Sequence, residues 1–331
     1  MRQNPVHLFA LSLGTLTLAA CSDFNLQQLK TGEAEPDYTL DPVAGEQQDE
    51  EWTAEEDEEM GGGDEGSFGT DDEPEEETPD EEEEETPEEE PAPEDDCEDT
   101  SELIYVVERD NDTLMLFDPQ TVSFTALGAL ECDYWSRPAS MGIARDGVGL
   151  VRYADDSVYE VDLETLACTP VDYSRPGDFD SFGMGFATER AGTWRDHLFV
   201  ADRDTLARFD RNTHEITPVG TMPSQSELTG NAAGELWAFL PLEHPAALVE
   251  LDQTNGRELQ YLSLPGFPDA SNLDAFAFAA WDGEFWLFVR TYGMGNSTDV
   301  YRVTASGELI LERERVGFDV VGAGVSTCAP E

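Results

Sequence analysis

Hydrophobic and polar positions recur five times along the C-terminal two-thirds of the chain. Each repeat begins with an apolar run, which reads LIYVVE at 103–108, GLVRYA at 149–154, HLFVAD at 197–202, LWAFL at 236–240 and FWLFVR at 285–290. An acidic or glycine turn follows, and then a run such as SVYEVD at 157–162 or TLARFD at 205–210, where apolar and polar residues alternate. Alternation with a period of two predicts strands with one buried face and one wet face.

Each alternating run ends in a similar short turn motif, and the spacing of these motifs gives the length of the repeat. The same position of the motif is occupied in the first four repeats by Asp118, Asp162, Asp210 and Asp252, and in the fifth repeat by Thr304. Aspartate at such a position hydrogen-bonds its own backbone and starts a turn. The five positions are 44, 48, 42 and 52 residues apart, a spacing that fits a four-stranded propeller blade of about 40–50 residues.

Strands rich in small residues precede the apolar runs from the second repeat onward. They read SMGIA at 140–144, FGMGFA at 182–187, LTGNAA at 228–233 and AFAFAA at 275–280. Glycine and alanine allow inner strands to crowd around a central channel. The first repeat lacks such a strand, whereas the chain ends on one, VVGAGVST at 320–327. The sequence therefore predicts an all-β fold, a β-propeller of five four-stranded blades whose first blade is closed by the C-terminal strand, which removes an open edge. The alternative is an open β-sandwich.

The N-terminus has the layout of a secretory signal. A basic residue precedes a short apolar run that ends Leu-Ala-Ala-Cys at 18–21, too short to span a bilayer. This ending resembles the bacterial lipobox, which implies cleavage before Cys21, lipidation of that cysteine and firm membrane anchoring by several acyl chains. Ser22 rather than aspartate follows, which favours the outer membrane by the sorting habit of enteric lipoproteins. The alternative is an ordinary signal peptide with an incidental cysteine.

Charge divides the rest of the chain. Residues 31–99 hold 35 Asp and Glu and no Lys or Arg, a composition that predicts a disordered, extended tether. The expected organisation is a signal peptide at 1–20, a lipidated cysteine with an acidic linker at 21–96, and a propeller domain at 97–331. The linker is either a solvated spacer or a region that captures calcium or a cationic partner. From residue 100 onward 15 arginines face 38 acidic residues, which argues against nucleic-acid binding.

Four cysteines remain after lipidation, an even number that suggests two disulfides in an exported protein. Cys328 follows the last inner strand and Cys97 precedes the first apolar run, so a Cys97–Cys328 bond would staple the ring shut. That leaves Cys132 with Cys168. In a simple blade Cys132 and Cys168 lie toward opposite faces of the propeller, so the connector at 131–139 would have to cross from one face to the other. Zinc binding is the competing use, but the paired spacings typical of zinc sites are missing.

Candidate chemistry gathers in the turns between the second and third strands. Asp110, Asp112, Asp155, Asp156, Asp202 and Asp204 lie there, and together they could hold calcium, which takes six to eight oxygen ligands. Aspartate is equally the residue that tight hairpins use. A second group, with aromatic rings and one imidazole, suits a sugar- or peptide-binding surface: Tyr134, Trp135, Tyr173, Tyr292 and His244. The sequence contains no serine-hydrolase elbow, zinc-protease motif or phosphate-binding glycine loop.

The lipobox, acidic linker, five repeats and terminal VVGAGVSTCAP together resemble uncharacterised predicted lipoproteins of myxobacteria and related delta-proteobacteria. The resemblance covers nearly the whole chain and is most specific at 140–147, 182–188 and 322–328. It implies the architecture and the envelope location, and no catalytic residues. The turns are also similar to those of six- and seven-bladed lactonases and lyases, whose metal-ligand set this chain lacks.

These observations predict a monomeric, non-enzymatic lipoprotein of the outer membrane. It is tethered by its lipid and presents a propeller face to an envelope protein or a glycan. The first alternative is a hydrolase or lyase, dependent on calcium or on carboxylates in the same loops. The second is a purely structural spacer in an envelope assembly.

Overall fold

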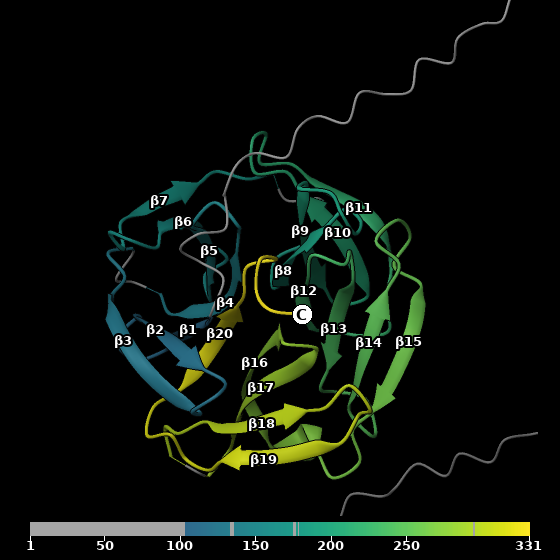
Figure 1. Ribbon diagram of the computed structural model, residues 1–331. Coiled ribbons are helices and arrows are strands. Elements are labelled where there is room, and N and C mark those ends of the chain that lie inside the picture. Colours follow the sequence, from purple (N-terminus) through teal and green to yellow (C-terminus); the bar gives the residue numbers. More distant parts are fainter. Residues whose placement is uncertain (1–102, 133–135, 175–176, 178, 294) are drawn as a thin grey trace, which may run out of the picture. The chain divides into compact units, whose positions relative to one another are not determined.

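A computed structural model describes residues 103–331 except 133–135, 175–176, 178 and 294. Over this part of the chain the fold is all-β, with five four-stranded antiparallel sheets and one short 3-10 helix, η1 (Ala270–Asn272). The sheets stand around a common axis as the blades of a propeller (Figure 1), so the predicted fold is confirmed. None of the described segments is a helix long and apolar enough to cross a membrane.

The four strands of each blade follow one another from the axis outward. Blade 1 contains β20 (Val320–Gly324), β1 (Ile104–Glu108), β2 (Thr113–Asp118) and β3 (Ser123–Ala129). Blade 2 contains β4 (Pro138–Ile143), β5 (Val148–Tyr153), β6 (Val158–Asp162) and β7 (Cys168–Val171). Blade 3 contains β8 (Gly183–Thr188), β9 (Asp196–Asp202), β10 (Thr205–Phe209) and β11 (Ile216–Thr221). Blade 4 contains β12 (Glu227–Gly230), β13 (Leu236–Leu240), β14 (Ala247–Leu251) and β15 (Glu258–Ser263). Blade 5 contains β16 (Leu273–Trp281), β17 (Glu284–Thr291), β18 (Asp299–Val303) and β19 (Leu309–Arg313).

The C-terminal strand closes the ring, as the sequence predicts. β20 pairs antiparallel with β1, with Tyr105 opposite Gly324 and Val106 opposite Ala323. On its other sides β20 packs between β16 of blade 5 and β4 of blade 2, and the chain end lies at the centre of the ring (Figure 1). Blade 1 therefore joins the two ends of the domain, and its inner edge is not left open.

Each interface between neighbouring blades holds one hydrophobic cluster. Along β1, Ile104 and Val106 face blade 5, whereas Tyr105 and Val107 face blade 2. Both faces of the second strand are thus covered, which explains why these strands read as unbroken apolar runs. The third strands are less completely covered: in β6 the face expected to be wet is half-buried, whereas in β10 and β14 both faces include buried residues.

The inner strands approach one another so closely that two glycines have no room for a side chain. A Cβ on Gly185 of β8 would lie 2.5 Å from the carbonyl oxygen of Leu228 in β12. A Cβ on Gly322 of β20 would lie 3.0 Å from the backbone nitrogen of Met141 in β4. Small residues in these strands therefore let the five inner strands meet around the axis.

The outer strands run head to tail around the rim (Figure 1). Just beyond the end of β3, Glu131 forms a parallel bridge with Ala167, immediately before β7. Ser174 makes the same kind of bridge with Glu215, immediately before β11. Strand twist accumulates across a blade, so the outermost strand lies along the circumference and its end reaches the start of the next outer strand.

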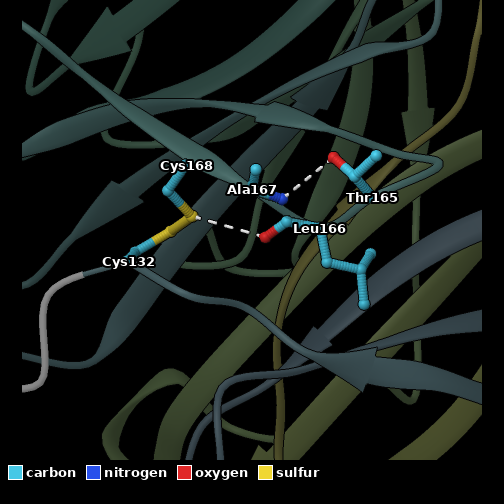
Figure 2. The surroundings of a disulfide bond; sticks show 5 residues. All are labelled: Cys132, Thr165, Leu166, Ala167 and Cys168. Carbon is cyan, nitrogen blue, oxygen red and sulfur yellow. Dashed lines mark hydrogen bonds between the residues drawn. A yellow bond between two sulfur atoms is a disulfide. The ribbon is translucent and has the colours of Figure 1, made fainter.

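This arrangement brings Cys132 and Cys168 together in a disulfide with a Cα–Cα distance of 5.0 Å (Figure 2). The predicted pair is confirmed, but the expectation that its ends lie toward opposite faces is wrong, because it treated the blade as untwisted. The backbone nitrogen of Glu131 donates to the carbonyl oxygen of Leu166 beside the bond. Cys328 is also disulfide-bonded, whereas Cys97 lies outside the described residues.

Candidate functional site

The turns between the second and third strands of all five blades lie on one face of the ring, because every blade has the same connectivity. These turns fall at 109–112, 154–157, 203–204 and 241–246, and in blade 5 between β17 and β18. The inner strands begin on the same face. We call it the mouth face.

The six aspartates predicted to hold calcium stay apart. Asp110 accepts a hydrogen bond from Nδ2 of Asn296 at 2.7 Å, which links blades 1 and 5. Asp155 accepts from the backbone nitrogen and hydroxyl of Ser157, at 3.2 and 2.6 Å, inside its own turn. Within the described ranges no three Asp, Glu, His or Cys side chains gather to hold a metal ion.

The remaining four aspartates also have local roles. Asp202 is buried and accepts from the backbone nitrogen of Asp180 at 2.8 Å. Thr205 donates to the neighbouring Asp204 at 3.5 Å. Asp112 and Asp156 have positive φ angles of 50° and 67°, a conformation that aspartate tolerates in turns. Within the described residues these aspartates therefore hold turns and contacts between neighbouring segments, and they do not gather as a calcium site.

The structure describes three of the five residues that were predicted to form an aromatic surface. Tyr134 and Trp135 lie outside the described residues. Tyr173 donates its hydroxyl to the carbonyl oxygen of Asp156 at 2.8 Å and packs on Phe182 and Phe209, so it serves the core between blades 2 and 3. Tyr292 is 65% exposed in the blade 5 turn, and His244 is exposed beside a cis bond to Pro245 in blade 4.

A cavity of about 310 Å³ opens at the mouth face where the inner strands begin. Every blade contributes to its wall. Blade 1 supplies Arg109 and Val321, and blade 2 supplies Arg137, Pro138, Ala139, Arg152 and Ala154. Blade 3 supplies Phe182 and Gly183, blade 4 supplies Gln225, Ser226 and Glu227, and blade 5 supplies Asp274, Ala275 and Phe276. We call it the axial cavity. It combines an apolar wall with three arginines and two carboxyl groups.

Two arginines and two aspartates form an ion-pair network at one side of this cavity. Arg109 lies 3.2 Å from Asp274 and 3.0 Å from Asp319, and Arg290 lies 3.1 Å from Asp274 and contacts Asp319. Burial raises the pKa of Asp319, while the two guanidinium groups oppose that rise. The network joins blade 5 to the segment just before β20. Its two positive guanidinium groups are matched by its two negative carboxylates.

Glu227 is buried in the wall of the cavity and connects three blades. Its Oε2 accepts from the hydroxyl of Ser140 in blade 2 at 2.7 Å, and its carboxyl also accepts from the backbone nitrogen of Met184 in blade 3. A Cβ on Gly183 would lie 3.0 Å from the Glu227 carboxyl carbon. Burial raises the pKa of Glu227 to about 8, so the carboxyl is mostly protonated at neutral pH.

This pKa predicts how stability depends on pH. The folded-state value of about 8 exceeds the ordinary value of 4.5, so the contribution of Glu227 is complete below pH 4.5 and is lost as pH rises through 8. Glu227→Gln keeps a neutral group of the same shape. We expect the variant to have a higher melting temperature than the native chain above pH 8, with the gap shrinking toward pH 4.5. Thermal melts across this range check it, and a constant gap would contradict it.

Arg152 in β5 is the most buried cation of the cavity, at 6% exposed. Its Nε donates to the carbonyl oxygen of Phe182 at 2.7 Å and its Nη1 to that of Tyr153 at 3.1 Å. The guanidinium also lies over the Phe182 ring, 5.7 Å from its centroid. These contacts fix the guanidinium at the wall of the cavity.

Sequence reasoning missed both Glu227 and Arg152, because it looked for functional residues in the turns and not in the strands. A signal was present in each case. Arg152 is the single charge within the apolar run GLVRYA, and Glu227 stands directly before the small residues of its inner strand. Charged groups are rarely buried unless they are paired or functional, so a lone charge in a buried strand marks a position of interest.

Comparison with known proteins gives a fold likeness only. No family model matches the chain, and no curated protein matches it. Among solved structures, the chain is similar to a protein of unknown function from Bacteroides caccae, at 7% identity and a TM-score of 0.41, over 68% of this chain and 98% of that one. It is also similar to a chain of a mitotic checkpoint complex, at 12% identity and a TM-score of 0.37, over 71% of this chain and 83% of that one. A third likeness is the extracellular domain of a one-component system of B. thetaiotaomicron, at 10% identity and a TM-score of 0.36, over 66% of this chain and 28% of that one.

Proposed function

We propose that this protein is a lipid-anchored protein of the bacterial outer membrane whose propeller binds an envelope protein or a glycan at the mouth face. One observation carries the binding role: the axial cavity has a wall built by all five blades. Concave sites with an apolar wall and a few fixed polar groups are typical of ligand binding. The lipobox and acidic linker would hold this face away from the membrane.

Binding explains the cavity better than catalysis does. Asp274 is held by Arg109 and Arg290, and Glu227 is held by Ser140 and the Met184 backbone. The carboxyl near Asp274, that of Asp319, is held by the same two arginines, and no second carboxyl or histidine that lines the cavity lies beside Glu227. The hydrolase or lyase alternative requires a convergent set of carboxylates, and the described aspartates of the loops do not converge.

The anchor is tested by Cys21→Ser, which removes the thiol that lipidation requires. We expect the native chain to sediment with membranes and the variant to appear in the soluble envelope fraction. Cell fractionation followed by immunoblotting measures this. Membrane association that is unchanged in the variant would contradict the lipid anchor.

The binding face is tested by obstructing the cavity in the soluble Cys21→Ser chain. Ala154 is exposed at the cavity rim, whereas Ala191 is exposed in the turn between β8 and β9 on the opposite face. We expect Ala154→Trp to abolish binding to muropeptides or to arrayed envelope oligosaccharides, and Ala191→Trp to leave it unchanged. Equal binding by both tryptophan variants would contradict the assignment of the site, and an absence of binding by the unobstructed chain would contradict the binding role.

A further inference from the structure

The charge of Arg152 is not balanced by a neighbouring carboxylate. Its two hydrogen bonds go to neutral backbone carbonyls, and it forms no ion pair with any described residue. Glu227, Asp156 and Asp202 act on it only at longer range. Burial lowers the pKa of Arg152. Glu227 is the carboxyl group that opposes this shift most strongly, and it is itself mostly protonated at neutral pH. A buried cation ordinarily has a paired counter-ion.

The third nitrogen of this guanidinium faces available space. Nη2 of Arg152 has no hydrogen-bond partner among the described residues, and it is not among their fully buried unsatisfied atoms. Because Arg152 lines the axial cavity, Nη2 is accessible from there. An incoming oxygen atom could therefore accept a hydrogen bond from it.

A second cation stands at the rim of the same cavity. Arg137 is exposed and makes no side-chain hydrogen bond or ion pair within the described part of the chain, and the carboxyl of Asp112 acts on it only at longer range. Arg109, by contrast, is held by Asp274 and Asp319. The cavity thus contains two arginines without an ion pair among the described residues, in a domain whose acidic residues outnumber its arginines by 38 to 15. Positive groups that are free to pair in a cavity favour an anionic ligand.

The rest of the wall indicates what kind of anion fits. Pro138, Ala139, Ala275, Phe276 and Val321 give the wall apolar surface, and exposed Gln225 adds a neutral polar group at the rim. An inorganic anion would leave this apolar surface uncovered. An organic molecule with one carboxylate would cover it and place its oxygens on the arginines, the pairing that guanidinium groups favour.

We propose that the axial cavity binds an organic carboxylate, with Arg152 Nη2 at its base and Arg137 at its rim. This inference rests on the proposed binding role of the cavity and gives the chemistry of its ligand. A uronic acid of a glycan and the C-terminal carboxylate of a peptide supply the same group. Binding is expected to need both the arginines and the apolar wall, so neutral analogues of the uronic acid or of the peptide are expected to bind poorly.

The experiment uses the soluble Cys21→Ser chain and four probes at equal ionic strength. Two are carboxylates, D-glucuronate and N-acetylalanine, and two are their neutral counterparts, D-glucose and N-acetylalanine amide. A ligand that binds only the folded state raises the melting temperature. We expect a rise with at least one carboxylate and none with its neutral counterpart. The carboxylate that gives the larger rise distinguishes the glycan source from the peptide source.

Two matched variants assign the effect to the cavity. Arg137→Gln removes an unpaired rim cation, and Arg257→Gln removes an exposed arginine in a blade 4 turn on the opposite face. We expect Arg137→Gln to weaken carboxylate binding about tenfold without lowering the melting temperature of the free protein, and Arg257→Gln to leave binding unchanged. Arg152→Lys keeps the buried charge but loses the planar fork, so it also weakens binding if it folds.

The outcomes separate the two proposals. Equal shifts with charged and neutral probes, no shift with either carboxylate, or a shift unaffected by Arg137→Gln would each overturn the carboxylate assignment. If a neutral ligand binds and Ala154→Trp blocks it, the binding role of the cavity survives and only the ligand chemistry is wrong. If carboxylates bind but Ala154→Trp has no effect, the axial site itself is wrong.

Discussion

Deleting residues 320–331 from the soluble chain is expected to abolish cooperative unfolding. The deletion removes β20 with its buried Val320, Val321 and Ala323, and the buried Val325 that follows the strand. Burial of one valine side chain stabilises by about 1.5 kcal/mol or more, so the loss is comparable with the ~5–15 kcal/mol that separates folded from unfolded domains. The deletion also exposes the inner edge of β1 along its whole length.

The measurement is a circular dichroism melt together with gel filtration. We expect the truncated chain to show no sharp transition and to elute as aggregates or as an expanded species. Because the deletion also removes Cys328, the matched control is Cys328→Ser in the full-length chain, which should still melt cooperatively. A truncated chain that melts at the native midpoint would show that β20 is dispensable and that the ring does not depend on it.

Replacing both Cys132 and Cys168 by alanine is expected to lower stability by about 3–4 kcal/mol, the second largest effect. The two cysteines are 36 residues apart in sequence, and the chain-entropy account of disulfides gives about that value for a loop of this length. The bond also fastens the end of β3 to the start of β7 at the rim. For a domain of this size the melting temperature should fall by on the order of 10 °C.

Thermal melts of the double variant and the native chain, both oxidised, test this. Reductant added to the double variant should lower its midpoint further, since Cys328 belongs to another disulfide. Reductant added to the native chain should reproduce the sum of both losses. A double variant with an unchanged midpoint would mean that the rim contact between blades 1 and 2 holds without the covalent bond.

The propeller could be predicted because residues close together in the sequence define its repeat. The turn aspartates at 118, 162, 210 and 252 set the period, and the small residues of 320–327 identify a strand without a partner after it. Both signals depend on neighbours in sequence. The pairing of β20 with β1 then follows from topology alone, because only blade 1 lacks an inner strand.

The position of the site could be predicted only in part. The sequence placed it on the loop face, which is where the axial cavity opens, but it chose six aspartates that have other partners, such as Asp155 with Ser157 in its own turn and Asp110 with Asn296 of blade 5. Arg152 and Glu227 come together from blades 2 and 4, 75 residues apart in sequence. Their meeting depends on the angle between blades and on strand twist, which periodicity does not encode. The same twist explains the rim contact that the untwisted blade failed to predict.

Hydrogen exchange tests the central claim most directly, that five inner strands, including the C-terminal one, form a closed ring around the axial cavity. The backbone amides of β20 should exchange as slowly as those of β8, β12 and β16, because all four strands then open only when the domain unfolds. Rapid exchange in β20 alongside slow exchange in the other inner strands would show that the C-terminal strand is loosely attached. In that case the ring is open and the axial cavity lacks one of its five walls.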